Sequence, residues 1–412
     1  MEKWLHLANI YSDTSGNRFV LSILIIALAF GAADAKTGTI CARGCDYSSI
    51  ALGLDAAKPG DILEVHSGTY LENINITKPL KLKGLDTGEG KPIIDAGGSG
   101  SAITLSTDGI ILDGFNTTNS LGSLLEIWAG IKVTSNDNTI INNTVFNNEN
   151  GIIITSSSNN TVRANKAINN INGMKLERAN LNHIMANNLS KNNYGLFLVT
   201  SARNEIVENI ADDNDFGIQI NASSNNVLKD NRMFGNSYNF GGEGNNNISA
   251  SNLVDGRPIY YLIGASGKII DSSSNAGTIY CLDCNNVTIK GLTPRNNSYG
   301  IYLFNTTNSI IENNMASYNQ NGIYLLRSQR NVVIDNNAGH NIEGIALASS
   351  RYNNIRRNTA FDNSYAGLIV SFSNYNNITS NEVMKNNKGI FVLKSGFNRI
   401  DINNLSENSI AL

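Results

Sequence analysis

Proline and net charge are both low in this chain. It has five prolines in 412 residues, and 31 Lys and Arg against 34 Asp and Glu leave a net charge of −3. This balance provides no basic surface for nucleic acid, so we expect no nucleic-acid partner. Asparagine instead makes up about one residue in six, a polar bias that also occurs in disordered chains. Regularly spaced Ile, Val and Leu argue against disorder, because they supply a core once per repeat.

The apolar stretch near the N-terminus is short. Residues 19–33 are uncharged and end in the small-x-small motif Ala33-Asp34-Ala35, whereas a comfortable membrane span needs about 20 apolar residues. The pattern predicts a signal peptide over residues 1–35, and a retained N-terminal anchor is the alternative. We therefore expect no membrane span in the mature chain and a secreted, cell-surface or periplasm-like location. The many Asn-x-Ser/Thr sequons agree with an exported glycoprotein, although an Asn-rich chain also produces them by chance.

What the chain has in abundance is a repeat of about 22 residues, Gly-Ile-x-Ile…Asn-x-Ile-x-x-Asn. Such a period marks a solenoid, in which each unit buries its apolar face only against its neighbours. Three short strands and three turns per unit predict one coil of a parallel β-helix, with Leu196 and Leu198 pointing inward and Phe197 outward. The opening glycines are Gly130, Gly151, Gly173, Gly195, Gly217, Gly277, Gly300, Gly322, Gly344, Gly367 and Gly389.

Asparagines recur at one turn of the repeat, where we expect their amides to stack as a hydrogen-bonded ladder. The predicted ladder residues are Asn138, Asn160, Asn182, Asn204, Asn226, Asn286, Asn308 and Asn331.

The solenoid is predicted to begin with a capping helix and to be interrupted once. Ile50, Leu54 and Ala57 fall on one helical face, and Pro59-Gly60 ends the helix. The period breaks between Gly217 and Gly277, and we expect a compact flap there. The predicted regions after the signal peptide are an N-terminal segment with the capping helix (36–61), a first part of the β-helix (62–239), the insertion or flap (240–276) and a second part (277–412).

Three sequence features together point to a known family. They are the Gly-Ile-x-Leu…Asn-x-Ile coils, the segment from Pro59-Gly60-Asp61 to Leu71-Glu72-Asn73, and the string Asp255-Gly256-Arg257-Pro258-Ile259-Tyr260-Tyr261. In these features the chain resembles the NosD-like family over residues 46–412, and the last string is the more specific of the three. The resemblance implies an exported, all-β, right-handed parallel β-helix solenoid, from a group that includes carbohydrate-binding proteins and sugar hydrolases. It also implies, as an alternative function, a copper-handling accessory protein that works with an ABC transporter.

Outward aromatic side chains predict a binding surface. Phe197, Tyr302, Tyr324 and Phe391 share the second position after the repeat glycine, where the core does not need them. Tyrosines in a row along a solenoid can bind sugar rings or a partner protein; the alternative is that the insertion or cross-strand neighbours cover them. We expect a binding module for a glycan or an exported protein partner. Its predicted ligand-binding residues are Phe197, Tyr302, Tyr324, Phe391, Tyr260 and Tyr261.

Cysteine, histidine and methionine are too dispersed to indicate a copper site clearly. Copper delivery would favour clustered soft ligands. Among the histidines and methionines after residue 35, however, only His183 and Met185 lie close together. In an exported chain, the pairs Cys41/Cys45 and Cys281/Cys284 predict two disulfides, with free thiols or a redox pair as the alternative for the second. No cofactor is assured, and copper at His183 and Met185 stays an open possibility.

Acidic and basic clusters leave catalysis and calcium open as well. Asp212-Asp213-Asn214-Asp215 could supply part of a calcium site, although a solvated turn is the simpler interpretation. His183 and Glu205 should be neighbours across one coil step, as general acid–base pairs require. Arg327, Arg330 and Arg351 could grip an acidic sugar in a polysaccharide lyase or epimerase. No complete set of base, acid and charge neutraliser is present, so we name no catalytic residue and lean against an enzyme.

The C-terminal end of the chain predicts self-association. One more period after Gly389 reaches Ala411, so the sequence stops where another coil would begin. An uncapped parallel edge can pair with another chain, and end-to-end association is therefore expected, with a truncated reading frame as the alternative.

Overall fold

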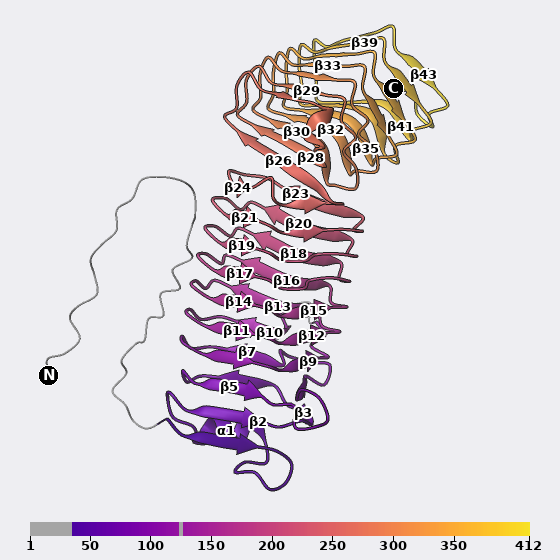
Figure 1. The fold of residues 1–412 in the computed structure, drawn as a ribbon. Coiled ribbons are helices and arrows are strands. Elements are labelled where there is room, and N and C mark those ends of the chain that lie inside the picture. Colours follow the sequence, from indigo (N-terminus) through magenta and orange to yellow (C-terminus); the bar gives the residue numbers. More distant parts are fainter. Residues whose placement is uncertain (1–34, 123–126) are drawn as a thin grey trace, which may run out of the picture. The chain divides into compact units, whose positions relative to one another are not determined.

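The computed structural model describes residues 35–122 and 127–412, and the predicted signal peptide lies almost entirely outside them. Lys36–Leu412 forms one compact unit. Its short strands pair with strands about one repeat away in sequence, and almost every pairing is parallel (Figure 1). The predicted parallel β-helix solenoid is thus confirmed. Within the described residues, no helix is long and apolar enough to cross a membrane.

The predicted capping helix is also confirmed, as α1 (Ile50–Ala56). The Ser49 hydroxyl accepts a hydrogen bond from the Leu52 amide, which caps the helix start. The carboxylate of Glu72 accepts the amide N–H groups of Ile50 and Ala51 at 3.1 and 2.9 Å. These two donors would otherwise have no partner within the helix. The buried face of helix α1, which includes Ile50 and Leu54, therefore packs on the core of the first coils.

Three parallel sheets form the first part of the solenoid, which we call the first stack. The ten-stranded sheet contains β1 (Thr37–Ile40), β2 (Ile62–Val65), β5 (Lys81–Gly84), β8 (Ile111–Asp113), β11 (Thr139–Ile141), β14 (Thr161–Arg163), β17 (His183–Met185), β19 (Glu205–Val207), β21 (Val227–Lys229) and β24 (Asn247–Ile248). The eight-stranded sheet contains β4 (Ile74–Ile76), β7 (Ile103–Leu105), β10 (Ala129–Val133), β13 (Asn150–Thr155), β16 (Asn172–Glu177), β18 (Tyr194–Val199), β20 (Phe216–Asn221) and β23 (Tyr238–Gly242). The five-stranded sheet contains β3 (Thr69–Leu71), β6 (Ile93–Asp95), β9 (Asn116–Thr118), β12 (Thr144–Phe146) and β15 (Lys166–Ile168).

Three further sheets form the second stack. The nine-stranded sheet contains β22 (Arg232–Met233), β25 (Leu253–Val254), β26 (Arg257–Ile263), β28 (Thr278–Leu282), β30 (Tyr299–Phe304), β32 (Asn321–Leu326), β35 (Glu343–Ala348), β38 (Ala366–Ser371) and β41 (Lys388–Leu393). The seven-stranded sheet contains β27 (Ile269–Ile270), β29 (Thr288–Lys290), β31 (Ile310–Glu312), β33 (Val332–Ile334), β36 (Asn354–Arg356), β39 (Asn377–Thr379) and β42 (Arg399–Asp401). The four-stranded sheet contains β34 (Asn337–Gly339), β37 (Thr359–Phe361), β40 (Glu382–Met384) and β43 (Asn404–Ser406).

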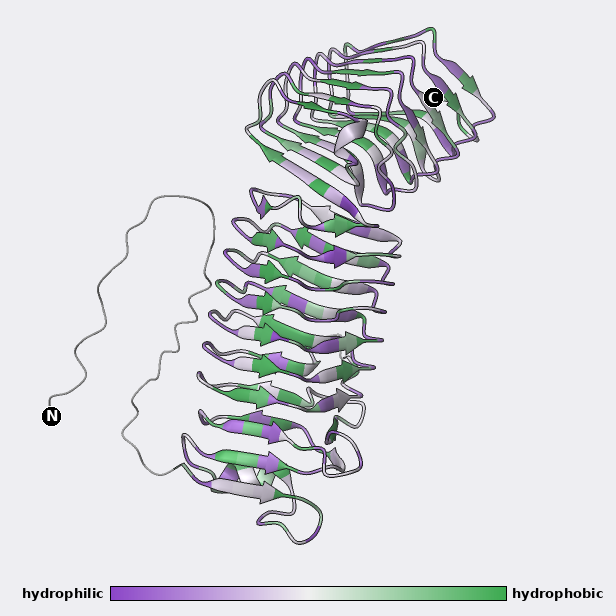
Figure 2. Cartoon of the chain, in the orientation of Figure 1, coloured by the Kyte–Doolittle hydropathy of each residue, from purple (hydrophilic) through white to green (hydrophobic). Residues whose placement is uncertain are grey.

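The core of each stack is a row of aliphatic side chains that point into the coil. Leu196 and Leu198 are fully buried while Phe197 between them is half-buried, as the strand period of two requires. Apolar residues follow the strands and polar residues follow the turns throughout (Figure 2). The buried residues fall into two large clusters, one of which joins the first stack to Tyr280 and Tyr302 of the second.

Buried asparagine ladders hold the turns together. The Asn182 amide group donates to Asn204 Oδ1 at 3.1 Å, and the Asn182 backbone N–H donates to the same oxygen at 3.0 Å. From Asn138 onward this pattern occurs at three turns of each coil in the first stack, two more than expected. Asn286 and Asn308 are a correction: both are exposed, and Val287 and Ser309 occupy the buried positions one residue later.

The segment 240–276 is built into the solenoid instead of forming a separate flap. Its strand β24 ends the ten-stranded sheet of the first stack, whereas β25 and β26 lie together in the nine-stranded sheet, where β25 also pairs with β22 of the preceding coil. The change of stack is made by a hairpin, because β25 and β26 pair antiparallel through Leu253–Pro258 and Val254–Arg257. The short 3-10 helix Ser272–Ser274 follows β27. The break in the period therefore marks a junction between two stacks.

Candidate functional site

Side chains from both stacks meet at this junction. The Ser298 amide donates to the Phe240 carbonyl at 3.0 Å, and Gln219 Nε2 donates to Ser298 Oγ at 2.8 Å. The Phe240 ring meets the edge of Tyr280 with ring centroids 5.4 Å apart. These contacts position strands β20 and β23 of the first stack against β28 and β30 of the second.

A cluster of tyrosines fills the second-stack side of the junction. Tyr261, Tyr280, Tyr302 and Tyr324 lie in register on successive strands. Tyr299 stacks on Tyr302 and Tyr324 at centroid distances of 4.7 and 5.5 Å. Burial raises the pKa of the Tyr261, Tyr299 and Tyr302 hydroxyls, so these groups stay protonated as hydrogen-bond donors at neutral pH.

Tyr302 is therefore a correction to the predicted binding surface. Its side chain is 2 % exposed and belongs to the buried cluster, so a ligand cannot reach it. Strand β28 is shifted by one residue: Tyr280, the third residue after Gly277, pairs with Tyr302, the second residue after Gly300. The aromatic column therefore begins at Tyr261, and Tyr280 and Tyr324 flank Tyr302 on its two sides.

An open groove lies beside this cluster, and we call it the aromatic groove. It has a volume of about 220 Å³, and both stacks contribute to it. On the first stack, Tyr194 stacks on Phe197 and Phe216 with centroids 5.0 and 4.7 Å apart, and Phe216 continues to Tyr238 at 5.3 Å. All four of these rings are partly exposed. Tyr194, Phe197 and Phe216 line the groove and form an apolar platform of stacked rings along one wall.

Polar groups face that platform from the junction. Gln219, Glu243, Ser298 and Gln320 line the same groove. The Tyr299 hydroxyl donates to Glu243 Oε1 at 3.0 Å, and the Tyr261 hydroxyl donates to the Gly244 carbonyl, so two tyrosines hold the loop that carries Glu243. The groove therefore combines stacked rings with amide and carboxylate groups, an arrangement typical of small-ligand sites.

The other predicted ligand-binding residues lie in different places. Phe197 lines the aromatic groove. Tyr324 is half-buried against Tyr299 and Tyr302, and Tyr260 packs on the core of the second stack. Phe391 lies near the C-terminal end of the described chain, at the edge of Tyr365 and under Lys388. The structure thus brings Phe197 close to Tyr299 but leaves Phe391 apart from the groove.

Sequence reasoning did not find Tyr194, Phe216 or the polar wall. A signal was present, because Tyr194 and Phe216 occupy the position just before the repeat glycine that Asn150 and Asn172 occupy in the preceding coils. Replacement of an amide by aromatic rings on consecutive coils marks a local departure from the repeat. Gln219 and Gln320 gave no comparable signal, since only the register between the stacks brings them together.

The two cysteine pairs differ. Cys41 and Cys45 form the predicted disulfide. Cys281 and Cys284 are instead free, buried thiols, contrary to the prediction. Cys281 points into the core from β28, while the Cys284 thiol is directed at the carbonyls of Leu262 and Leu282, 3.8 and 3.6 Å away. The contact with Cys284, together with burial, raises the pKa of the Cys281 thiol well above its usual value.

The residues around His183 do not fit a copper site. His183 Nδ1 lies 2.8 Å from Glu205 Oε2, so its ring is engaged by a hard carboxylate, and both side chains are exposed. Met185 lies two residues along the same outward face of β17. Across residues 35–122 and 127–412, the one group of at least three His, Cys, Asp or Glu side chains close enough to share a metal is Cys41, Cys45 and His66. There the disulfide occupies both sulfurs, which as thiolates would be soft ligands.

The acidic turn and the arginine cluster have protein partners. Arg232 donates to the Asp212 carboxylate, and burial raises the pKa of Asp212 against the effect of that arginine. Arg327 lies over the Phe304 ring, and Arg330 and Arg351 lie over Tyr352 at 6.0 and 5.9 Å. These pairings are those of a polar surface, and they supply no general base.

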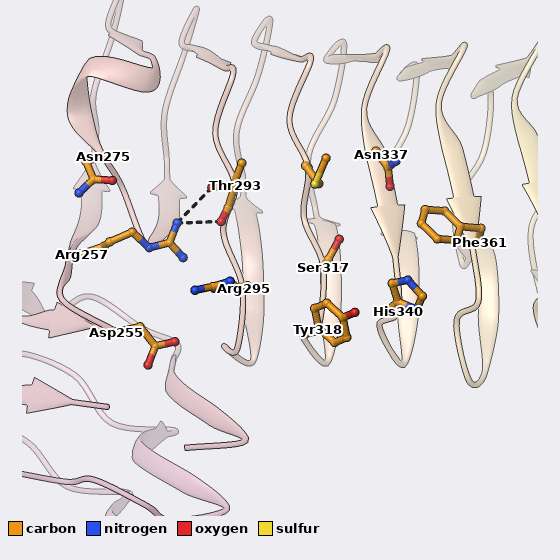
Figure 3. A pocket seen from close by; sticks show the side chains of 11 residues that line it. Asp255, Arg257, Asn275, Thr293, Arg295, Ser317, Tyr318, Asn337, His340 and Phe361 are labelled. Atoms are coloured by element: carbon orange, nitrogen blue, oxygen red, sulfur yellow. Dashed lines mark hydrogen bonds between the residues drawn. The ribbon is translucent and has the colours of Figure 1, made fainter. Parts of the chain in front are cut away.

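A second hollow opens on the second stack, next to the start of β26. It has a volume of about 600 Å³ and is lined by Asp255, Arg257, Arg295, Tyr318 and His340, among others (Figure 3). Of these, Asp255 and Arg257 belong to the family-specific string noted in the sequence. We call it the arginine hollow.

Comparison with known proteins places the chain in a family. No curated protein matches it. Among solved structures, pectate lyase Pel9A is 16% identical, with 68% of this chain and 76% of that chain covered and a TM-score of 0.42. The A-module of a mannuronan C-5 epimerase from Azotobacter vinelandii is 12% identical, with 86% and 89% covered and a TM-score of 0.29. The family model described as periplasmic copper-binding protein (NosD) matches residues 60–257 and 245–412. The chain therefore belongs to the NosD family.

Proposed function

We propose that this protein is an exported binding module that recognises a glycan in the aromatic groove. The observation that carries the proposal is the set of stacked rings of Tyr194, Phe197 and Phe216, which line the aromatic groove together with Gln219 and Glu243.

The two walls suit the two faces of a sugar. The apolar C–H groups of a pyranose can pack on the partly exposed edges of these stacked aromatic rings. Glutamine amides both donate and accept hydrogen bonds, and a carboxylate accepts, so Gln219, Gln320 and Glu243 can pair with ring hydroxyls of either kind. Gln219 is already held by Ser298 and Glu243 by Tyr299. Such fixed polar groups lower the entropy cost of binding.

A glycan array followed by calorimetry tests this function. We expect the chain to bind a set of oligosaccharides, and Tyr194→Ala or Phe197→Ala to weaken that binding about tenfold, because each removes one stacked ring. Phe234→Ala is the matched control, since Phe234 is an aromatic residue of the same stack that is 57% exposed and does not line the groove. Absence of binding to any glycan, or equal losses in Phe234→Ala, would refute the proposal.

A second candidate function is Cu(I) binding at the N-terminal cluster. Cys45 Sγ lies 3.6 Å from His66 Nδ1, and the ligand atoms of Cys41, Cys45 and His66 all lie within 4.8 Å of one another. A dithiol reductant would convert the disulfide to two thiols with two electrons and two protons, and would itself become a disulfide. Two thiolates and an imidazole form a soft ligand set that suits Cu(I). These three residues would hold the ion, and the family description agrees with such a role.

Competition with a Cu(I) chelator tests this second function. We expect stoichiometric binding by the reduced protein, none by the oxidised protein, and a loss in Cys45→Ser and His66→Ala. His183→Ala serves as the control and should bind normally, because its imidazole is engaged by Glu205. Equal binding by the oxidised and reduced forms would contradict the assignment to this cluster.

A further inference from the structure

The arginine hollow presents two cationic side chains without acidic partners. Arg257 Nη1 donates to the carbonyl and hydroxyl oxygens of Thr293 at 2.8 and 3.2 Å, while its Nη2 has no hydrogen-bond partner among the described residues. Arg295 lies in front of it with an exposed side chain (Figure 3). In the described part of the chain, neither guanidinium forms an ion pair with a carboxylate. The hollow is lined by two arginines and one carboxylate, Asp255, and therefore holds an excess of positive charge.

The nearby carboxylate is already in use. Asp255 Oδ1 accepts the Gly235 amide at 3.2 Å, and its Oδ2 accepts Asn296 Nδ2 at 3.0 Å. These bonds tie Asp255 to the junction. Burial lowers the pKa of Arg257, the like charge of Arg295 lowers it further, and the charge of Asp255 raises it. The two guanidiniums line one partly enclosed hollow, where charges interact more strongly than in bulk water.

Aromatic rings line the next turns of the same hollow. Tyr318 stacks on His340 with centroids 5.0 Å apart and planes 11° apart, and His340 meets the edge of Phe361 at 4.9 Å. Tyr318 is 57% exposed, so its ring adds little to the core.

We propose that the arginine hollow binds an acidic sugar, with its oxyanion on Arg257 and Arg295 and its ring face on Tyr318. The planar guanidinium fork matches a carboxylate or a sulfate ester, and the two guanidiniums point toward one space. The aromatic platform suits the C–H face of the same residue. This inference rests on the proposed function as a glycan-binding protein and narrows its ligand to an anionic glycan.

Calorimetry with oligogalacturonate, its methyl ester and a sulfated galactan oligosaccharide tests the inference on the full mature chain. We expect at least one of the two anionic probes to bind about tenfold more tightly than the neutral methyl ester, and this preference to shrink with salt. Preference for the uronate identifies a carboxylate as the oxyanion, and preference for the galactan identifies a sulfate.

Two variants and a control locate the effect. Arg295→Gln removes one exposed guanidinium and should abolish the preference for the anion while leaving methyl ester binding unchanged, and Tyr318→Ala should weaken both. Arg351→Gln makes the same charge change on an exposed arginine outside the hollow and should change neither. Melting temperatures establish that each variant is folded.

Failure of this inference differs from failure of the proposed function. If glycans bind in a manner sensitive to Tyr194→Ala but without preference for an anion, the groove function stands and the arginine hollow is not an acidic-sugar site. Equal effects of Arg295→Gln and Arg351→Gln would overturn the inference in the same way. If no glycan of either kind binds, both proposals are wrong.

Discussion

Single asparagines hold this solenoid together. Asn187 is 1% exposed, and its Nδ2 donates to the Val162 carbonyl and to Asn209 Oδ1, both at 2.9 Å. Its Oδ1 in turn accepts the Asn165 backbone N–H and side-chain amide at 3.0 and 3.1 Å. One side chain thus satisfies two buried backbone groups of the preceding coil and also bonds to the ladder amides of the coils on both sides. This explains why so polar a residue is so abundant in the interior.

Removal of one such side chain should be costly. We expect Asn187→Ala to lower the free energy of unfolding by about 2–4 kcal/mol, because it leaves the Val162 carbonyl and the Asn165 N–H buried without partners. Urea unfolding followed by circular dichroism measures the change. Asn193→Ala, at an exposed position, should cost less than about 0.5 kcal/mol. Equal stabilities of the two variants would show that the ladder does not stabilise the fold.

At the scale of strands and turns, the sequence predicted the elements well where the repeat is regular. Gly195 and its coil had the expected inward and outward faces, and one asparagine ladder was placed correctly from Asn138 to Asn226. The errors lie where a coil carries a shift of one residue. After Gly277 the inward residue is Ile279, not the residue that directly follows the glycine, and Asn286 and Asn308 are displaced from the buried ladder. Local pattern cannot detect such a shift, because only pairing with the next strand defines the register.

The candidate site was predictable only in part for the same reason. Phe197 could be recognised as an outward aromatic residue, and it does line the aromatic groove. Tyr302 satisfied the same criterion and is buried, because the rings of Tyr280, Tyr299 and Tyr324 pack against it. Contacts such as Gln219 with Ser298 join residues 79 positions apart, outside the reach of a 22-residue pattern.

At the scale of the whole molecule, the junction couples the two stacks. Phe240 is fully buried at this point, with the Tyr280 ring against it and its carbonyl bonded to Ser298. The first stack's core cluster continues through this contact into the second stack. The junction should therefore contribute both to stability and to the shape of the aromatic groove.

A substitution that leaves a cavity at the junction should affect both stability and glycan binding. We expect Phe240→Ala to destabilise the protein by about 3–5 kcal/mol, as for other buried Phe to Ala changes, and to weaken glycan binding although Phe240 does not line the groove. Chemical denaturation and calorimetry measure the two effects. Leu228→Ala, which removes a buried side chain from the core cluster of the first stack, should lower stability but spare binding. If both variants bind equally well, the groove does not depend on the junction.

The hydrogen bonds of the asparagine ladders also set the steps in which this protein can change length. Most ladder partners are 22 residues apart, so each amide finds an equivalent amide on the next coil. Loss or duplication of one whole coil would leave every ladder joined to a matching partner. The solenoid can therefore lengthen or shorten in whole coils. It can also take up a single extra residue at a turn without breaking the ladders, as in the coil whose ladder partners are 23 residues apart.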